Sequence, residues 1–207
     1  MMKKIIIRAL AATSVIGLFF LAGCSGRSQA TNFYVLSPVT DYGIEMKNAA
    51  NAGSTVSIAI SPVVLPKYLK KSQIVTRTGR NELHLAEYDR WAGKFAEDIE
   101  RVIAENLSHM LFTDKVFSHP PMEAIAIDYH VNIEISRFDG RLGGDMELIA
   151  RWGIFDNRES LVSGIRATHI TRPTRGRGYV DLVAAQSLAL AELSREIAAA
   201  LEKLPGN

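Results

Sequence analysis

The sequence predicts an α+β fold, a two-layer sandwich in which two amphipathic helices cover one face of a largely antiparallel mixed sheet. Three observations predict it. Several short segments alternate apolar and polar residues with period two, two longer segments carry apolar stripes at helical spacing, and the segments follow the order β-β-β-β-α-β-β-β-α. A sheet with one polar and one apolar face needs cover on the apolar face only, which the two helices would provide.

The strands are predicted from this alternation. The clearest is residues 124–136, in which every second side chain is apolar and most of those between are polar. Pro62 and Pro66 limit the strand at residues 55–65, because proline cannot donate a ladder hydrogen bond. The other expected strands are residues 33–37, 73–78, 82–87, 145–155 and 161–171. The strands at residues 73–78 and 82–87 are expected to form a hairpin.

The two helices are predicted from apolar stripes. Apolar residues from Trp91 to Leu111 recur at three- and four-residue steps, and Asp89 is the expected N-cap of this first helix. The second helix is expected at residues 180–203. Between two of the later strands, the glycines of residues 140–145 are expected to allow the positive φ angles of a turn.

The N-terminal residues 1–23 have the layout of a secretory signal peptide: basic residues, an apolar run and small residues at its end. The motif Leu21-Ala22-Gly23-Cys24 matches the bacterial lipobox. This resemblance implies cleavage before Cys24, a diacylglycerol thioether on its sulfur and an acyl chain on its new amine. The alternative is an uncleaved anchor or an ordinary signal peptide in which the cysteine is incidental.

Residues 24–32 are expected to form a lipidated tether and residues 33–207 a single domain. The eight small or polar residues after Cys24 reach at most about 28 Å, at roughly 3.5 Å each. In lipoproteins of Gram-negative bacteria, an aspartate after the cysteine usually signals retention in the inner membrane. Ser25 therefore implies, by that resemblance, the inner leaflet of the outer membrane, with the domain facing the periplasm.

The charge balance argues against nucleic acid as a partner. The chain has 24 basic and 22 acidic residues, and the signal peptide holds three of the basic residues and no acid. The mature chain therefore carries a net charge near −1, which lacks the basic excess of nucleic-acid-binding domains.

Catalytic and cofactor motifs are not evident in the sequence. None of the five histidines has a metal-ligand spacing such as HExxH, and no serine lies in a nucleophile-elbow motif. We therefore expect no catalytic residues, no metal and no cofactor. The alternative hypothesis is a hydrolase or cell-wall-binding lipoprotein that uses the polar strand residues Asp128, His130 and Glu134, although alternation alone accounts for them.

Two segments stand out as candidate binding surfaces. Residues 62–71 place apolar side chains between prolines and lysines, and these either enter the core or await a partner; the partner-binding candidates are Val64, Leu65, Tyr68 and Leu69. Residues 171–178 crowd Arg172, Arg175 and Arg177 before the last helix, where they could hold an anion or lipid headgroup. A solvated turn is the favoured interpretation of these arginines.

Three blocks of the sequence resemble a known family. They are FYVLSP at residues 33–38, the run VSIAISPVVLPKYLKKSQIVTRTGRNELHLAEYDRWA at residues 56–92, and IERVIAENLSHML at residues 99–111. These blocks are similar to the ABC-type transport auxiliary lipoproteins of the PqiC (YmbA) type. The chain departs from that pattern at Gly93-Lys94, where relatives usually carry an acid and a proline.

The resemblance implies a non-enzymatic component of an MCE-type system, which moves lipids between the two membranes and supports envelope integrity. It implies an inner-membrane-anchored MCE-domain protein that spans the periplasm as the partner, with this chain as the docking element at the outer membrane. A homo-oligomeric ring is a further expectation from that role.

Overall fold

Two sheets, rather than the single sheet expected, form from the alternating segments. The computed structural model describes residues 29–42, 56–118 and 125–205, and all but Gln29 and Ala30 of these belong to one compact unit, Thr31–Asn207. The expected signal peptide, Cys24 and most of the tether lie outside the described residues. Among the described residues, no helix is both long enough and apolar enough to span a membrane.

The larger sheet has five strands in the order β5-β2-β6-β7-β8. Its first three strands in that order run parallel to one another, and the last two join antiparallel. The strands are β2 (Ile58–Ile60), β5 (Val116–Phe117), β6 (Tyr129–Gly140), β7 (Asp145–Asp156) and β8 (Arg166–Pro173). The long antiparallel strands come from the segments in which alternation was clearest.

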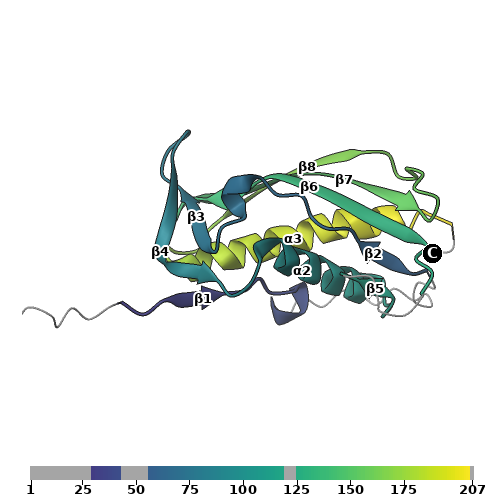
Figure 1. Ribbon diagram of the computed structural model, residues 1–207, viewed down its shortest axis with the longest axis horizontal. Coiled ribbons are helices and arrows are strands. Elements are labelled where there is room, and N and C mark those ends of the chain that lie inside the picture. The colour runs from purple at the N-terminus through teal and green to yellow at the C-terminus, as the bar shows by residue number, and fades with distance from the viewer. Residues whose placement is uncertain (1–28, 43–55, 119–124, 206–207) are drawn as a thin grey trace, which may run out of the picture. The chain divides into compact units, whose positions relative to one another are not determined.

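The smaller sheet has three strands in the order β1-β4-β3. The strand β1 (Asn32–Tyr34) pairs in parallel with β4 (Leu83–Trp91), and β3 (Gln73–Arg77) pairs with β4 as the expected hairpin. Figure 1 shows this sheet at the end of the molecule where β1 enters.

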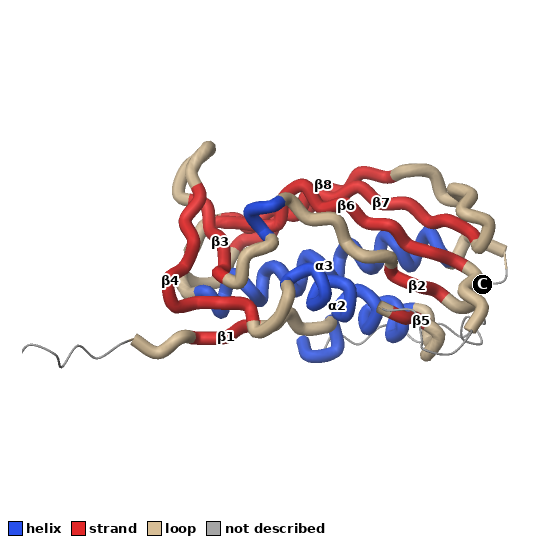
Figure 2. The backbone as a smooth tube through the Cα atoms, viewed as in Figure 1, coloured by secondary structure: helices blue, strands red, loops and turns tan. Residues whose placement is uncertain are grey.

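Two helices cover the inner face of the five-stranded sheet (Figures 1 and 2). They are α2 (Phe95–Met110) and α3 (Tyr179–Leu201), and two short 3-10 turns, η2 (Val39–Tyr42) and η3 (Lys67–Leu69), complete the described elements. The core between the layers holds the inward side chains of the strands, among them Val131, Ile133, Leu148, Trp152 and Ile154. The predicted two-layer α+β sandwich is therefore confirmed.

The predicted start of the first helix is wrong. Asp89 lies in β4, where its carboxylate accepts hydrogen bonds from Asn32 Nδ2 (3.0 Å) and the Tyr34 hydroxyl (2.7 Å). The helix begins at Phe95, six residues later. Trp91 ends the strand and stacks on Phe95 with 4.1 Å between ring centroids, so one apolar stripe joins a strand end to a helix start. Spacing alone cannot detect that change of backbone.

Several strand limits also differ from the prediction. The regular strand expected at residues 55–65 is only Ile58–Ile60, because the prolines interrupt its ladder. The strand predicted from residue 124 begins at Tyr129 and continues to Gly140, with a bulge between Ile135 and Arg137. The expected glycine turn is confirmed at Gly143, whose φ of 72° is positive.

Candidate functional site

In the segment of residues 62–69, side chains at the surface alternate with side chains in the core. Val64 N–H donates to Ile133 O (3.0 Å) and Ile135 N–H donates to Val64 O (2.9 Å), so the chain runs beside β6 even after the proline. Neighbouring side chains then alternate as in a strand. Leu65 is 4% exposed and faces the core, whereas Val64 is 55% exposed and faces outward.

The four predicted partner-binding residues therefore lie in three environments. Leu65 and Leu69 are core residues, each 4% exposed, and their side chains are not available to a partner in this chain alone. Tyr68 is partly buried and hydrogen-bonded within the domain. Val64 is the candidate that lies at the surface. The two interpretations left open for this segment apply to different residues of it.

A buried carboxylate joins this segment to both sheets. Asp139 is fully buried, and its Oδ2 accepts from the Tyr68 hydroxyl at 2.8 Å. Arg77 of β3 donates from Nε to Oδ1 (2.8 Å) and from Nη2 to Oδ2 (3.1 Å), and Arg137 Nε lies 3.2 Å from Oδ1. We call these four residues the Asp139 junction. It fixes η3 and β3 on the outer face of β6.

The electrostatics of the Asp139 junction follow from this geometry. Burial alone would raise the pKa of Asp139, but hydrogen bonds from Arg77 and Tyr68 and the charges of Arg77 and Arg137 lower the pKa overall. Burial, and then the hydrogen bond to the Asp139 carboxylate, raise the pKa of Tyr68. The carboxylate is thus held ionised and the phenol protonated, as a structural joint requires. Sequence reasoning missed Asp139, because two of its partners, Tyr68 and Arg77, are 71 and 62 residues away and nothing in the sequence shows that they meet.

Beyond the junction, the outer face of the five-stranded sheet carries a hollow of about 460 Å³. We call it the outer-face groove, and its lining includes Pro62, Val64, Glu134, Arg151 and Ile165. Val64 and Ile165 are exposed apolar side chains, and Glu134 pairs across the strands with Arg151. The groove therefore combines two exposed apolar side chains with two opposite charges that face each other on adjacent strands.

One glycine shapes the side of the groove. A Cβ at Gly153 would lie 2.9 Å from Leu161 Cδ1 and 3.0 Å from Ile165 Cδ1. The chain between β7 and β8 therefore packs directly on the sheet at Gly153, which brings the exposed Ile165 side chain over β7. A side chain at position 153 would force this segment outward.

The polar strand residues considered for catalysis do not converge. Asp128 Oδ2 accepts from both the backbone N–H and the hydroxyl of Ser57, each at 2.8 Å. Glu134 lines the outer-face groove, whereas His130 lines a neighbouring hollow of about 480 Å³. Within residues 29–42, 56–118 and 125–205, no group of three or more His, Cys, Asp or Glu side chains is arranged to hold a metal ion.

The three arginines before α3 differ in their partners. Arg172 lies in β8 and pairs with Glu192 of α3. The N-terminus of α3 already holds a carboxylate, because Asp181 Oδ2 accepts from Gly178 N–H at 3.0 Å. Arg175 and Arg177 are exposed, and among the described residues no carboxylate is within ion-pair distance of either. An anion would therefore meet these two guanidinium groups but also Asp181.

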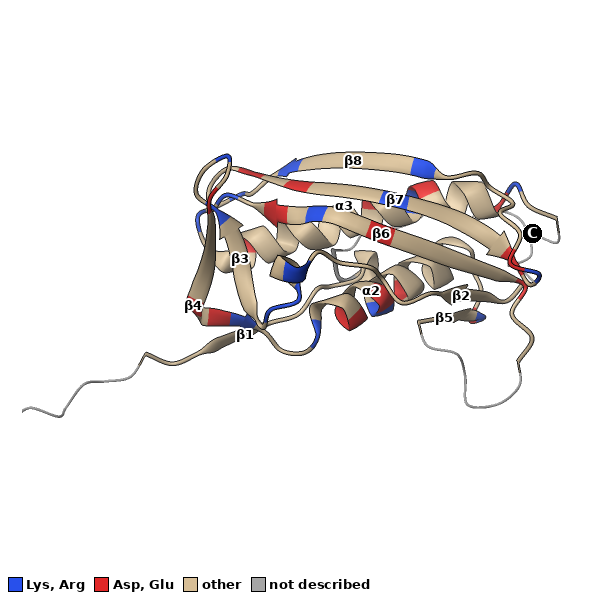
Figure 3. Cartoon of the chain, turned by 45° about the horizontal axis from the view of Figure 1, so that its top comes forward, with Lys and Arg blue, Asp and Glu red and all other residues tan. Residues whose placement is uncertain are grey.

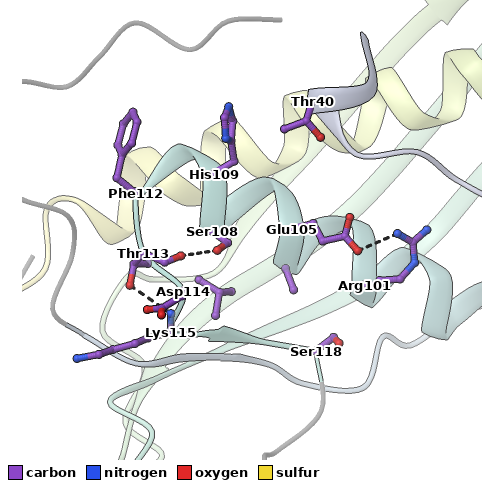
Figure 4. Close-up of a pocket in the computed structure, with 12 residues that line it drawn as sticks. Thr40, Arg101, Glu105, Ser108, His109, Phe112, Thr113, Asp114, Lys115 and Ser118 are labelled. Atoms are coloured by element: carbon purple, nitrogen blue, oxygen red, sulfur yellow. Dashed lines mark hydrogen bonds and ion pairs between the residues drawn. The ribbon is translucent and has the colours of Figure 1, made fainter. Parts of the chain in front are cut away.

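A wider hollow of about 980 Å³ lies between the end of α2 and β5. Figure 4 shows that its Ser108 and His109 side chains point in different directions. The Ser108 hydroxyl donates to Thr113 O, and Arg101 Nη1 donates to Glu105 Oε1 at 2.9 Å. These polar groups are engaged with one another, and they do not form a serine–histidine pair.

Charge is mixed over the strands. Figure 3 shows basic and acidic residues interspersed along β6 and β7, without one sign gathered on the sheet in that view. This distribution is typical of a surface that meets water or protein rather than a polyanion.

The family described as ABC-type transport auxiliary lipoprotein component matches residues 34–198. Two relatives, both called intermembrane transport lipoprotein PqiC, come from Escherichia coli (strain K12) and Shigella flexneri. Each is 24% identical over 190 residues, which covers 92% of this chain and 96% of the relative.

Two solved structures have a similar fold. A crystal structure of an uncharacterised protein superimposes with a TM-score of 0.68 at 20% identity, covering 84% of this chain and 99% of the other. A Xanthomonas campestris protein superimposes with a TM-score of 0.62 at 15% identity, covering 80% and 92%. At these identities the likeness concerns the fold alone.

Proposed function

Because the chain belongs to the ABC-type transport auxiliary lipoprotein family, we propose that it is the outer-membrane docking component of an MCE-type intermembrane lipid transport system. The match of residues 34–198 to that family carries the proposal. It also confirms the resemblance drawn from the blocks at residues 33–38, 56–92 and 99–111. In this proposal the protein is not an enzyme; it links an anchor in one membrane to a partner that reaches across from the other.

The N-terminal motif supports the anchor. Cys24 follows a signal-like segment and the residues Leu21-Ala22-Gly23, so lipid on Cys24 would hold the mature domain at the membrane. Stable anchoring takes more than one acyl chain, which is what a triacylated cysteine would supply. Ser25 supports the inner leaflet of the outer membrane as the location.

The outer-face groove is the surface we propose for the MCE-domain partner. The exposed side chains of Val64 and Ile165 supply apolar area, and Glu134 and Arg151 can set the register of a partner through charge. The groove sits on a rigid base, because the Asp139 junction and the β6 hydrogen bonds of Val64 hold the segment in place. A preformed surface loses little entropy when a partner binds.

Site-specific photo-crosslinking in cells tests this surface. A photo-reactive residue is placed at Val64 and, as the matched control, at Leu85, which is also apolar and exposed but lies in β4. We expect position 64 to crosslink to the MCE-domain protein and position 85 not to. The variant Val64→Asp should lose the partner while it keeps its unfolding temperature.

The anchor is tested in the same cells. Mass spectrometry of the mature N-terminal peptide and membrane fractionation are compared for wild type and Cys24→Ala. We expect a triacylated Cys24 in the outer-membrane fraction. A correctly anchored protein that never captures an MCE-domain protein from either position would refute the docking role, and an unmodified cysteine would refute the anchor.

A further inference from the structure

Three large apolar side chains are exposed where the N-terminal segment enters the domain. Phe33 is 66% exposed, Val35 is 55% exposed and Val180 is 66% exposed. We call these three residues the N-terminal apolar patch. Contacts between β1, the chain after it and α3 place all three at the same end of the domain.

The first contact is between two tyrosines. The rings of Tyr34 and Tyr179 lie 6.4 Å apart between centroids, and the Tyr34 hydroxyl is bound to Asp89. Because side chains alternate along an extended chain, Phe33 and Val35 face away from this inward-turned tyrosine. Val180 follows Tyr179 directly, so it lies at the end of α3 that the N-terminal segment contacts.

Hydrogen bonds then hold the chain along the helices. Leu36 N–H donates to Asp98 Oδ2 at 2.6 Å, and Ser37 N–H donates to Ser187 Oγ at 3.1 Å. Ser187 lies about two helical turns after Val180, on the same face of α3. The patch is therefore part of an ordered surface, and its side chains remain exposed although the backbone beneath them is fixed.

The position of the patch in the sequence limits its distance from the proposed anchor. Phe33 follows Cys24 by nine residues, a distance of at most about 32 Å at roughly 3.5 Å per residue. If Cys24 carries lipid, every copy of this patch stays within that reach of a bilayer. An exposed phenylalanine with two exposed valines suits the apolar side of the boundary between headgroups and acyl chains.

The charges around the patch are compatible with a lipid surface. Arg90 lies opposite Phe33 in the pairing of β1 with β4, and the exposed Arg175 and Arg177 precede α3. The nearby carboxylates of Asp89 and Asp181 accept hydrogen bonds, and that of Asp98 also pairs with Arg101. Exposed arginines next to apolar side chains favour anionic headgroups.

We infer that Phe33, Val35 and Val180 rest on the lipid surface that carries the anchor. This inference depends on the proposed lipidation of Cys24. Since α3 starts at the patch and has 23 residues, its far end would lie about 34 Å away along the helix, at 1.5 Å per residue. The contact would thus set which end of the domain faces the membrane and which end faces the periplasm.

The chain offers a direct test, because its one cysteine would be consumed by lipid. The variants Phe33→Cys, Val35→Cys and Val180→Cys each introduce a unique thiol, and Val162→Cys is the matched control. Val162 is also an exposed valine, but it lies beside the end of β7, where Val162 N–H donates to Ile154 O at 2.9 Å. Each full-length lipidated protein carries an environment-sensitive fluorophore in vesicles of phosphatidylethanolamine and phosphatidylglycerol.

Two quenchers distinguish lipid from protein. We expect the labels at positions 33, 35 and 180 to shift to shorter wavelength, to be quenched by spin-labelled lipid and to be protected from aqueous iodide. The label at position 162 should behave in the opposite way. Labels at 33, 35 and 180 that iodide reaches as easily as the control would overturn the inference. Protection from iodide without quenching by spin-labelled lipid would also overturn it, because a protein would then cover the patch.

Failure of the inference is separable from failure of the proposed function. Mass spectrometry of the same samples reports whether Cys24 is lipidated, and an unmodified Cys24 would overturn both. A lipidated protein whose patch labels remain in water would overturn the lipid contact alone. Because all three native side chains are exposed, the variants should unfold at the wild-type temperature, and any two positions suffice if one variant misfolds.

Discussion

The domain contains two groups of arginines that differ in their separation along the sequence and in the burial of their partners. Arg77 and Arg137 are 60 residues apart in sequence, yet both bind the buried carboxylate of Asp139. Arg172, Arg175 and Arg177 are close together in sequence, yet one pairs with Glu192 at the surface and the other two are exposed. Arginines that are close in sequence are easy to recognise as a motif. A strong interaction, however, requires a buried partner such as Asp139.

The energetic difference between the groups should be large. A surface ion pair contributes about 0–1 kcal/mol, because water screens it and the side chains lose entropy. Removing one partner of a buried ion pair costs about 3–5 kcal/mol, because the remaining charge is left uncompensated. The predictions below test whether the Asp139 junction and the arginines before α3 fall in these two classes.

The largest effect is expected for Asp139→Ala. Arg77 and Arg137 would lose their shared acceptor, and we expect the free energy of unfolding to fall by about 3–5 kcal/mol in urea titrations. The matched control is Glu147→Ala, which removes a partly exposed partner of Arg137 at 2.7 Å and should cost less than about 1 kcal/mol. Equal losses in the two variants would show that the junction is no stronger than a surface pair.

Tyr68→Phe should cost less, about 1–2 kcal/mol. It removes the hydroxyl that donates to Asp139 at 2.8 Å and leaves the ring in place. In the Asp139→Ala background the same substitution should cost clearly less, because the acceptor is already absent. Additive losses in this double-mutant cycle would contradict a direct interaction between the two side chains.

The pH dependence of stability should carry the sign of the lowered Asp139 pKa. A carboxylate with a lowered pKa in the folded state stabilises the fold above its unfolded pKa, near 3.8, and loses this contribution as pH falls through the folded value. The difference in unfolding free energy between wild type and Asp139→Ala should therefore stay constant from neutral pH to about pH 5 and shrink below that. A difference that grows on acidification would have the wrong sign.

The smallest effect is expected for the arginines before α3. Arg175→Ala and Arg177→Ala should each change the free energy of unfolding by less than about 0.5 kcal/mol, and Arg172→Ala by less than about 1 kcal/mol through loss of the Glu192 pair. Thermal unfolding of the three variants measures this directly. A loss as large as that of Asp139→Ala would place these arginines with the buried group.

The predicted fold was confirmed where the pattern is a property of neighbouring residues. The alternation that continues through β6 and β7 and the stripe of α2 depend on the sequence within each element, so the two-layer α+β arrangement could be predicted. The family could be predicted from the block at residues 56–92, and the comparison over residues 34–198 confirmed it. Lipidation of Cys24 stays a prediction, because that residue lies outside the described part of the chain.

The candidate site was predicted only in part, because burial depends on which segments meet. The segment of residues 62–69 was identified, but its sequence alone does not show that Val64 is exposed while Leu65 and Leu69 are buried. The hydrogen bonds of Val64 to β6 make that separation. Likewise, only the structure shows that Trp91 ends β4 and that α2 begins at Phe95, beyond Asp89.

By itself, then, the sequence determined the order of the elements apart from the two-residue β5, their periodicity, the lipobox-like N-terminus and the family. Only the tertiary structure decided that the strands divide into two sheets and that Asp139 joins them through Arg77, Arg137 and Tyr68. The physical reason is that periodicity is set by local backbone geometry, whereas the strength of a charge interaction is set by how much water the surrounding elements exclude.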